Sequence, residues 1–220
     1  MFNQVWVISL QSGLTAAGRT DFVRSLRELS GTVASEPDTL IEPTLPGVYN
    51  GGDLLWRLQF ADEASHSQAH GHSQWRAEIN RLLQDRDRVS HVDGATYASA
   101  LSGGKSPPQG VYRLALFSAR PQASPRALAQ FTSETAQMAD YIHSIRRWQL
   151  SPVIASEGAR RWSFVWEQEY DDLAGLMGPY MMHPYHWAHI DRWFDPESTD
   201  WLIDRHLVHT YCNVKRPVIG

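Results

Sequence analysis

The sequence has little cysteine and no long hydrophobic run. Its single cysteine, Cys212, excludes an internal disulfide and a zinc site built from several cysteines. No apolar run approaches the ~20 residues that cross a bilayer. Residues 1–6 lack the basic start and apolar core of a signal peptide. We therefore expect a cytoplasmic protein with no membrane partner, in which Cys212 is buried and inert.

Positive charge and nucleotide-binding motifs are also missing. The formal net charge is −4 and no basic run occurs, which argues against nucleic acid as a partner. The Gly-Gly pairs at 51–52 and 103–104 lie in turn-rich connectors, so they do not predict a phosphate-binding loop. No Gly-x-Ser-x-Gly hydrolase elbow is present. We expect no nucleic-acid partner and no bound cofactor.

The composition of the 220-residue sequence is that of a globular protein, with a surplus of tryptophan and histidine. Hydrophobic residues are 42% and charged residues 20%, both close to globular averages. Of nine tryptophans and ten histidines, six of each lie from Val111 onward. Five of those histidines fall between His183 and His209. The second half is therefore richer in candidate functional side chains.

Apolar periodicity predicts the same order of elements twice, strand-helix-strand-strand-helix-strand. In the first half, strands are expected at 5–10, 32–39, 54–60 and 92–100, with helices after a Thr20-Asp21 cap and over 64–84. In the second half, strands are expected at 111–117, 150–156, 161–166 and 207–214, with helices over 124–145 and 173–194. Residues 102–110 have the composition of a linker.

The two halves can be overlaid, which indicates an internal duplication. Residues 5–8 match 111–114, and residues 55–58 match 161–164, both at an offset of 106. We predict an α+β fold of two fused ferredoxin-like repeats, residues 1–104 and 110–220. Each repeat has an antiparallel sheet with helices on one face, and the two remaining faces cover each other. Two similar patterns that arose by chance are the alternative.

The densest group of chemically active side chains lies around Pro184. Because proline disfavours helix at the preceding residue and suits the first turn, we expect a helix to begin at Pro184. His186 then lies in the first turn, where the helix dipole favours the neutral imidazole that a general base needs. The hydroxyl of Tyr180, before the break, could face the same cavity as a hydrogen-bond donor. The alternative is a Tyr and a His satisfied in a wet core.

The segment Tyr180-Met-Met-His-Pro-Tyr-His186 resembles the Tyr-x-x-His-Pro-x-His motif of the stress-responsive A/B-barrel (Dabb) family. This family consists of dimeric α+β barrels of the ferredoxin-like type. In a plant polyketide cyclase of the family, the Tyr and the last His are the catalytic pair, so the resemblance assigns catalysis to Tyr180 and His186. The first motif histidine, His183, becomes a pocket residue. Residues 166–172 form a longer stretch before the motif, so the substrate does not carry over.

Further substrate-binding candidates flank the motif or overlay it. Trp166, Tyr185 and Trp201 flank the motif or the longer stretch, and Trp187 and His189 follow the motif, although Trp187 also fits helical core packing. At an offset of 111, His186 overlays Trp75 and Tyr180 overlays Ala69. The first half therefore lacks the acid–base pair, and we expect one working site per chain, with Trp75 as a further candidate pocket residue.

A metal or haem site is a competing interpretation of the histidines. His183, His186 and His189 are three residues apart, and Glu167, Glu169 or Asp191 could add oxygen ligands. The spacing is not the His-Glu-x-x-His zinc motif, and Pro184 interrupts the helical register. Some α+β barrels of this broad type bind haem through one histidine. In the first half, His66, His70 and His72 are expected to lie at a solvated helix start.

Together these features predict a cofactor-independent acid–base enzyme that acts on a hydrophobic aromatic or phenolic small molecule. A carbon–carbon lyase of the retro-aldol or decarboxylating type is the preferred reaction, with a His base and a Tyr acid. Alternatives are a polyketide-type aldol cyclase, a non-catalytic hydrophobic-ligand-binding stress protein and a cofactor-free monooxygenase. The duplication removes the need for a homodimer without forbidding one.

Overall fold

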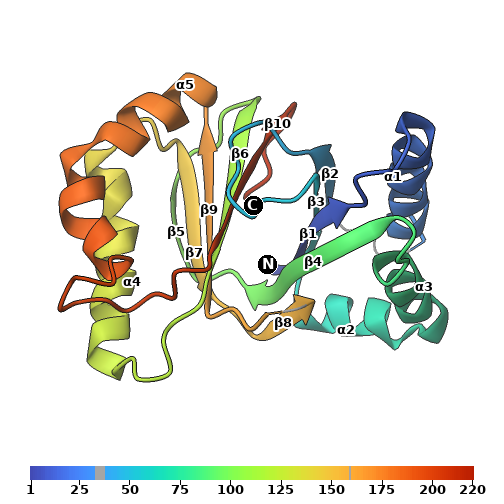
Figure 1. The fold of residues 1–220 in the computed structure, drawn as a ribbon, viewed down its shortest axis with the longest axis horizontal. Coiled ribbons are helices and arrows are strands. Elements are labelled where there is room, and N and C mark those ends of the chain that lie inside the picture. The colour runs from blue at the N-terminus through green and yellow to red at the C-terminus, as the bar shows by residue number, and fades with distance from the viewer. Residues whose placement is uncertain (33–37, 159) are drawn as a thin grey trace.

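The computed structural model describes residues 1–32, 38–158 and 160–220. Two five-stranded antiparallel sheets face each other at the centre of the molecule, and helices cover the outer face of each sheet (Figure 1). The strand orders are β2-β3-β1-β4-β8 and β10-β6-β9-β7-β5. No helix among the described residues is both long and apolar enough to span a membrane.

The first half contains four strands and three helices. They are β1 (Phe2–Leu10), α1 (Ala16–Ser30), β2 (Asp38–Pro43), β3 (Leu54–Phe60), α2 (Glu63–Gly71), α3 (Ser73–Leu83) and β4 (Val89–Ala98). The strand predicted at 32–39 lies mostly outside the described residues, and β2 begins at Asp38. The predicted Thr20-Asp21 cap is wrong, because α1 begins at Ala16 and the Thr15 hydroxyl accepts from Gly18 N at 3.1 Å.

The second half repeats this arrangement. Its elements are β6 (Gly110–Phe117), α4 (Pro125–Tyr141), β7 (Arg147–Pro152), β9 (Phe164–Tyr170), α5 (Leu173–Gly175), the π-helical η1 (Leu176–Tyr180) and η2 (His186–Ile190), the 3-10 helix η3 (Asp191–Trp193) and β10 (Val208–Val214). As predicted, Ser124 caps α4 and Pro125 opens it. The orders β2-β3-β1-β4 and β7-β9-β6-β10 are the same, which confirms the α+β fold of two fused ferredoxin-like repeats.

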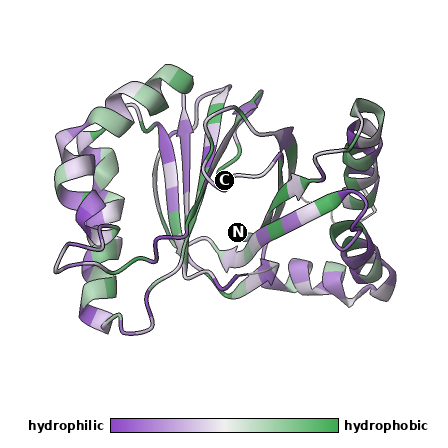
Figure 2. Cartoon of the chain, in the orientation of Figure 1, coloured by the Kyte–Doolittle hydropathy of each residue, from purple (hydrophilic) through white to green (hydrophobic). Residues whose placement is uncertain are grey.

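Three apolar clusters hold the layers together, and strand alternation separates them. On β1, Trp6 and Ile8 pack against the helices, whereas Val5 and Val7 pack against the opposite sheet. The second half has a corresponding cluster beneath α4 and η2. Figure 2 shows that the facing strands carry hydrophilic as well as hydrophobic residues.

A buried ion pair joins the two sheets. Arg57 of β3 donates from Nε to Glu167 Oε1 of β9 at 2.8 Å, and the side chains are 2% and 0% exposed. Tyr112 donates to the same carboxylate oxygen at 2.6 Å, and Gln149 donates to the other oxygen at 2.7 Å. Because a buried charge is costly unless it is paired and hydrogen-bonded, this network fixes how the sheets face each other.

Two short strands join the sheet of the opposite half. The four-residue strand β5 (Leu101–Gly104) follows the first half but pairs with β7, and β8 (Ala155–Gly158) pairs with β4. Both end in a glycine of positive φ, Gly104 and Gly158, where a Cβ would lie 2.1 Å from a backbone oxygen of the neighbouring strand.

This exchange corrects two predictions, and a third is corrected within the first half. Residues 102–110 are not simply a linker, since they include most of β5. The strand predicted at 150–156 is two strands in two different sheets, because the chain crosses after Pro152. The predicted helix over 64–84 divides at His72, which caps both pieces.

Candidate active site

A cavity of about 200 Å³ lies between the second sheet and its helices. Strands β6, β9 and β10 form its floor, and α4 with the segment from η1 to η3 forms its other walls. Most of its lining is aromatic or aliphatic. Its polar lining residues are Arg113, Thr135, Tyr180, His186, Asp191 and His209.

The break in the helix at Pro184 places the predicted pair on one wall. Asp172 caps α5 by accepting from Gly175 N at 2.8 Å, and η1 carries the chain to Tyr180. Helix resumes at Pro184, and His186 N donates to His183 O at 2.9 Å. His186 therefore lies in a first helical turn, as predicted. π-helical turns such as η1 and η2 are rare and often found at functional sites.

Tyr180 and His186 face each other edge to face across this wall. Their ring centroids are 4.7 Å apart with an interplanar angle of 65°. Burial lowers the pKa of His186 to about 4, and the nearby charges of Arg113 and His183 act in the same direction. His186 is therefore a neutral imidazole at physiological pH, the form that accepts a proton.

Neighbouring side chains limit the effect of burial on the pKa of the Tyr180 hydroxyl. Tyr180 is 2% exposed, and burial raises its pKa above the ordinary value. The charge of Arg113, 5.0 Å from the ring centroid, and the side chains of Trp166 and Gln168 favour the phenolate and limit that rise. Neither Trp166 Nε1 nor Gln168 Nε2 reaches full hydrogen-bond geometry with a described acceptor.

Asp191 stands behind His186. His186 Nδ1 is buried and lies 3.5 Å from Asp191 Oδ1, longer than a normal hydrogen bond, and has no other acceptor among the described residues. Burial raises the pKa of Asp191. His186 and Asp191 are arranged as a base and the carboxylate that orients it. The distance between two such groups often shortens when substrate binds.

Two cavity residues, Arg113 and His209, are missing from the sequence-based site. Arg113 of β6 donates from Nε to His209 Nε2 at 2.7 Å and from Nη1 to Gln168 Oε1 at 2.6 Å. Burial, followed by the charge of Arg113, lowers the pKa of His209 to about 2. A lone arginine within the apolar run 111–117 was the signal that could have found this group.

Of the other predicted pocket residues, Trp166 lines the cavity, whereas His183, Tyr185 and His189 lie outside it. Tyr185 stacks on Tyr141 at 4.4 Å and donates to Glu134 O at 3.2 Å. His183 Nδ1 accepts from Tyr185 N at 3.1 Å, and His189 stacks on the Tyr185 ring at 4.9 Å. These contacts make the segment 183–189 an outer wall that supports His186.

Three predicted tryptophans also lie away from the cavity. Trp187 is 57% exposed on the protein surface. Trp201 lies beneath Arg120, whose guanidinium is 3.7 Å from the ring centroid. Trp75 is buried in the first half and donates to Leu29 O at 3.2 Å. The structure therefore does not bring Trp75 to the cavity that holds Tyr180 and His186.

The geometry also bears on the competing histidine interpretations. Glu167 and Glu169 point to the opposite face of β9, because residues 166 and 168 face the cavity. In the described part of the chain, no three His, Cys, Asp or Glu side chains form a group that could hold a metal ion. The expected solvated position of His70 is wrong: its Nε2 hydrogen-bonds Gln4 Oε1 at 2.8 Å, and burial lowers its pKa to about 4.

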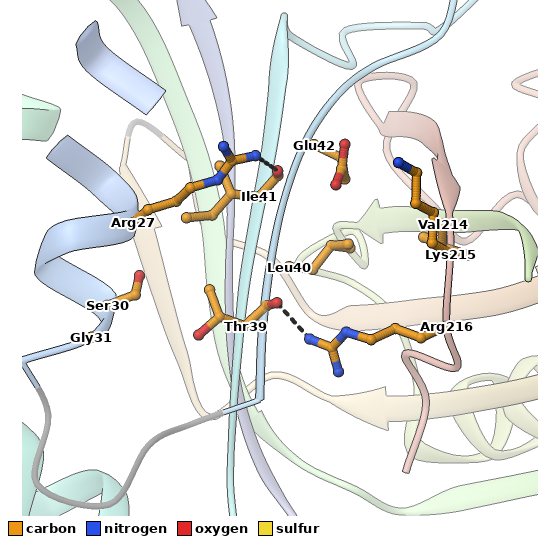
Figure 3. Close-up of a pocket in the computed structure, with 10 residues that line it drawn as sticks. All are labelled: Arg27, Ser30, Gly31, Thr39, Leu40, Ile41, Glu42, Val214, Lys215 and Arg216. Atoms are coloured by element: carbon orange, nitrogen blue, oxygen red, sulfur yellow. Dashed lines mark hydrogen bonds between the residues drawn. The ribbon is translucent and has the colours of Figure 1, made fainter. Parts of the chain in front are cut away.

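A larger hollow of about 450 Å³ lies at the seam between β2 and the end of β10, and Figure 3 shows its lining. Its basic side chains bind the protein itself. Arg27 donates to Ile41 O at 3.5 Å, and Arg216 donates to Thr39 O at 2.8 Å and pairs with Asp38. The contacts of Arg216 join the edges of the two sheets. Among the described residues that line this hollow, no Tyr–His pair like that of the smaller cavity is found.

A known protein family matches most of the half that contains this cavity. Residues 111–204 match the family model of the stress responsive A/B barrel domain. No curated protein sequence matches the chain. The fold is similar to that of an anthrone oxidase-like protein, with a TM-score of 0.67, 9% identity, and coverage of 97% of this chain and 90% of that chain.

Two other solved structures have the same fold over nearly the whole chain. The "putative monooxygenase" from Lactobacillus acidophilus NCFM has a TM-score of 0.56 and 10% identity, with coverage of 99% of this chain and 97% of that chain. A mutant chlorite dismutase from Candidatus Nitrospira defluvii has a TM-score of 0.55 and 10% identity, with coverage of 97% and 90%. At such identities the likeness concerns the fold alone.

Proposed function

From the premise that residues 111–204 form a stress-responsive A/B barrel domain, we propose that their cavity is the active site of a cofactor-independent acid–base enzyme. The substrate is an aromatic or phenolic small molecule, and the reaction is carbon–carbon bond cleavage of the retro-aldol or decarboxylating type. One observation carries this proposal. A neutral, partly buried His186 faces Tyr180, with ring centroids 4.7 Å apart, on the wall of a largely apolar cavity.

The size and lining of the cavity support an aromatic substrate of one ring. An apolar cavity of roughly 150 Å³ accommodates benzene, and this cavity measures about 200 Å³. Phe117, Trp166 and Phe194 supply aromatic walls, and the polar groups come from the sheet floor and from the helical wall. A small number of placed polar groups in an apolar pocket is typical of small-molecule sites.

In a retro-aldol step, His186 is the base and Tyr180 the acid. His186 removes the proton of the substrate's β-hydroxyl, the carbon–carbon bond breaks, and its electrons move onto the neighbouring carbonyl to form an enolate. Tyr180 hydrogen-bonds the enolate oxygen and delivers a proton to it. Asp191 Oδ1 lies 3.5 Å from His186 Nδ1. In the proposed reaction this contact shortens to a hydrogen bond that Nδ1 donates, so that Nε2 carries the lone pair and the imidazolium is stabilised. The reverse sequence describes an aldol cyclase.

Turnover of a panel of hydroxy-substituted aromatic substrates by purified variants tests this function. We expect His186→Gln to lower kcat/KM by about 10²–10⁴, because that is the range for losing a general base, and Tyr180→Phe to have a similar effect. The matched control is His70→Gln, which alters the half-buried histidine of the first half and leaves turnover unchanged.

Each alternative gives a different result in the same assay. Equal activity of His186→Gln and the wild type overturns the acid–base mechanism. Ligand binding without turnover in the wild type identifies a binding protein, in which the pair only anchors the ligand. Turnover that stops when oxygen is removed identifies a monooxygenase.

A further inference from the structure

Arg113 is a buried cation without an anionic partner. The residue is 5% exposed and lines the cavity of Tyr180 and His186. Among the described residues, no carboxylate lies within ion-pair distance of its guanidinium. Burial of a charge is costly unless the charge is paired. Arg57, another buried arginine, lies between the sheets and forms an ion pair with Glu167.

Both hydrogen-bond partners of Arg113 are neutral. His209 Nε2 accepts from Nε, so this nitrogen carries the lone pair, and the pKa of His209, lowered by burial to about 2, keeps the ring uncharged. Gln168 is an amide and accepts from Nη1. These contacts orient the guanidinium and leave its positive charge uncompensated.

The remaining terminal nitrogen, Nη2, is available to a ligand. Its two N–H donors form no hydrogen bond with a described residue, whereas Nε and Nη1 are both engaged. Asp191, the acidic residue of the same cavity, lies beside His186 and does not pair with Arg113. The cavity therefore has a fixed cation at the β6 side and the acid–base pair on the helical wall.

We propose that Arg113 binds the carboxylate of an aromatic acid, so that the substrate of this site is an arene carboxylate of about one ring. This proposal rests on the proposed function for the reaction, but its ligand chemistry follows from Arg113 itself. The aromatic walls hold the ring, and the carboxylate accepts from Nη2 in a charge-assisted hydrogen bond. A neutral arene would leave the buried charge uncompensated.

A bound carboxylate would also act on the base. Burial is the main cause of the low pKa of His186, and the charge of Arg113 is the second. A carboxylate paired with Arg113 offsets that second contribution, while burial remains.

Benzoate and its neutral isostere benzamide are the probes, and affinity is measured by calorimetry or tryptophan fluorescence. We expect the wild type to bind benzoate at least about tenfold more tightly, because a hydrogen bond to a charged group is worth roughly that factor or more. Arg113→Met loses this preference. The matched control is Arg126→Met, an exposed arginine at the start of α4, which keeps it.

Two further measurements keep the test decisive. His186→Gln retains the benzoate preference, which separates anion binding from the proposed reaction: failure of turnover leaves this result intact. Arg113→Lys keeps the charge and should retain part of the preference. This variant is measured as well, so that the test still works if Arg113→Met does not fold. Absence of benzoate binding, equal affinity for the two probes in the wild type, or a preference that survives in Arg113→Met overturns the proposal.

Discussion

The two halves share a strand order but fill the space beneath their helices differently. In the first half, Trp6 pairs across the strands with Trp56, and the two rings stack with centroids 4.2 Å apart. The neighbour of Trp6 on β4 is Gly94. A Cβ at Gly94 would lie 3.0 Å from Trp6 Cδ1, so the indole occupies the room that a side chain would need.

In the second half the large and small residues exchange places. Trp166 pairs with Ala115, and the neighbour of Ala115 on β10 is His209. The single methyl group of Ala115 leaves space above the sheet, and β10 supplies a polar ring instead of a bare backbone. Two stacked indole rings therefore fill the space beside the first sheet, whereas the corresponding region of the second sheet borders the cavity, although the two halves have the same backbone plan.

The polar residues next to these positions differ as well. Arg113 lies two residues before Ala115, and Gln4 lies two residues before Trp6. Gln4 Oε1 accepts from His70 Nε2, and Gln4 Nε2 donates to Glu157 Oε1. The first half thus has a neutral amide where the second half has a cation, so a few differences on one sheet face distinguish the repeat with stacked indoles from the repeat that contains the cavity.

Truncation of Trp6 gives the largest expected effect. Trp6→Ala removes a fully buried indole, so we expect the free energy of unfolding to fall by about 3–5 kcal/mol. Denaturant unfolding measures the change. A loss below about 1 kcal/mol would contradict the packed first half, because it would mean that the neighbours already leave space around the ring.

Transfer of the first-half arrangement to the second half gives a smaller change in stability. Ala115→Trp fills the cavity and costs about 1–3 kcal/mol through overpacking. Binding of an aromatic probe such as benzoate should disappear. Ala115→Gly is the matched control that keeps the cavity open, and binding that persists in Ala115→Trp would show that the cavity lies elsewhere.

The pH dependence of stability gives the smallest expected effect. The folded pKa of His186 is lowered to about 4 from the ordinary value near 6.5, so its contribution is fully present above pH 6.5 and is lost as the pH falls toward 4. Between pH 6 and pH 5 this group contributes a loss of at most about 1.4 kcal/mol. His186→Gln should remove that part of the slope in denaturant unfolding, and the exposed His72→Gln should not.

Local signals made much of the fold predictable. The run 54–60 coincides with β3, Ser124 and Pro125 open α4, and Pro184 restarts the helix, because alternation, capping and proline act within a few residues. The strands Leu101–Gly104 and Ala155–Gly158 escaped prediction. They are short and lack apolar alternation, and only their partners in the opposite sheet make them strands.

The candidate site divides in the same way. Tyr180 and His186 lie within seven residues of each other, so their relation could be predicted from the motif. Arg113 and His209 are far apart in sequence and meet because β6 and β10 are adjacent in the sheet. Trp75 was selected because it overlays His186 at an offset of 111, but its side chain is buried in the first half and does not reach the cavity. The offset of 106 is wrong for the third strand, where the offset from Leu54 to Phe164 is 110.

The two exchanged strands set the order in which the chain can complete its structure. During synthesis, the outer edge of β4 stays uncovered until Ala155–Gly158 has emerged, by which time β6, α4 and β7 have also been made. Exposed strand edges are templates for pairing with other chains. The first sheet is thus complete only after much of the second repeat has been made.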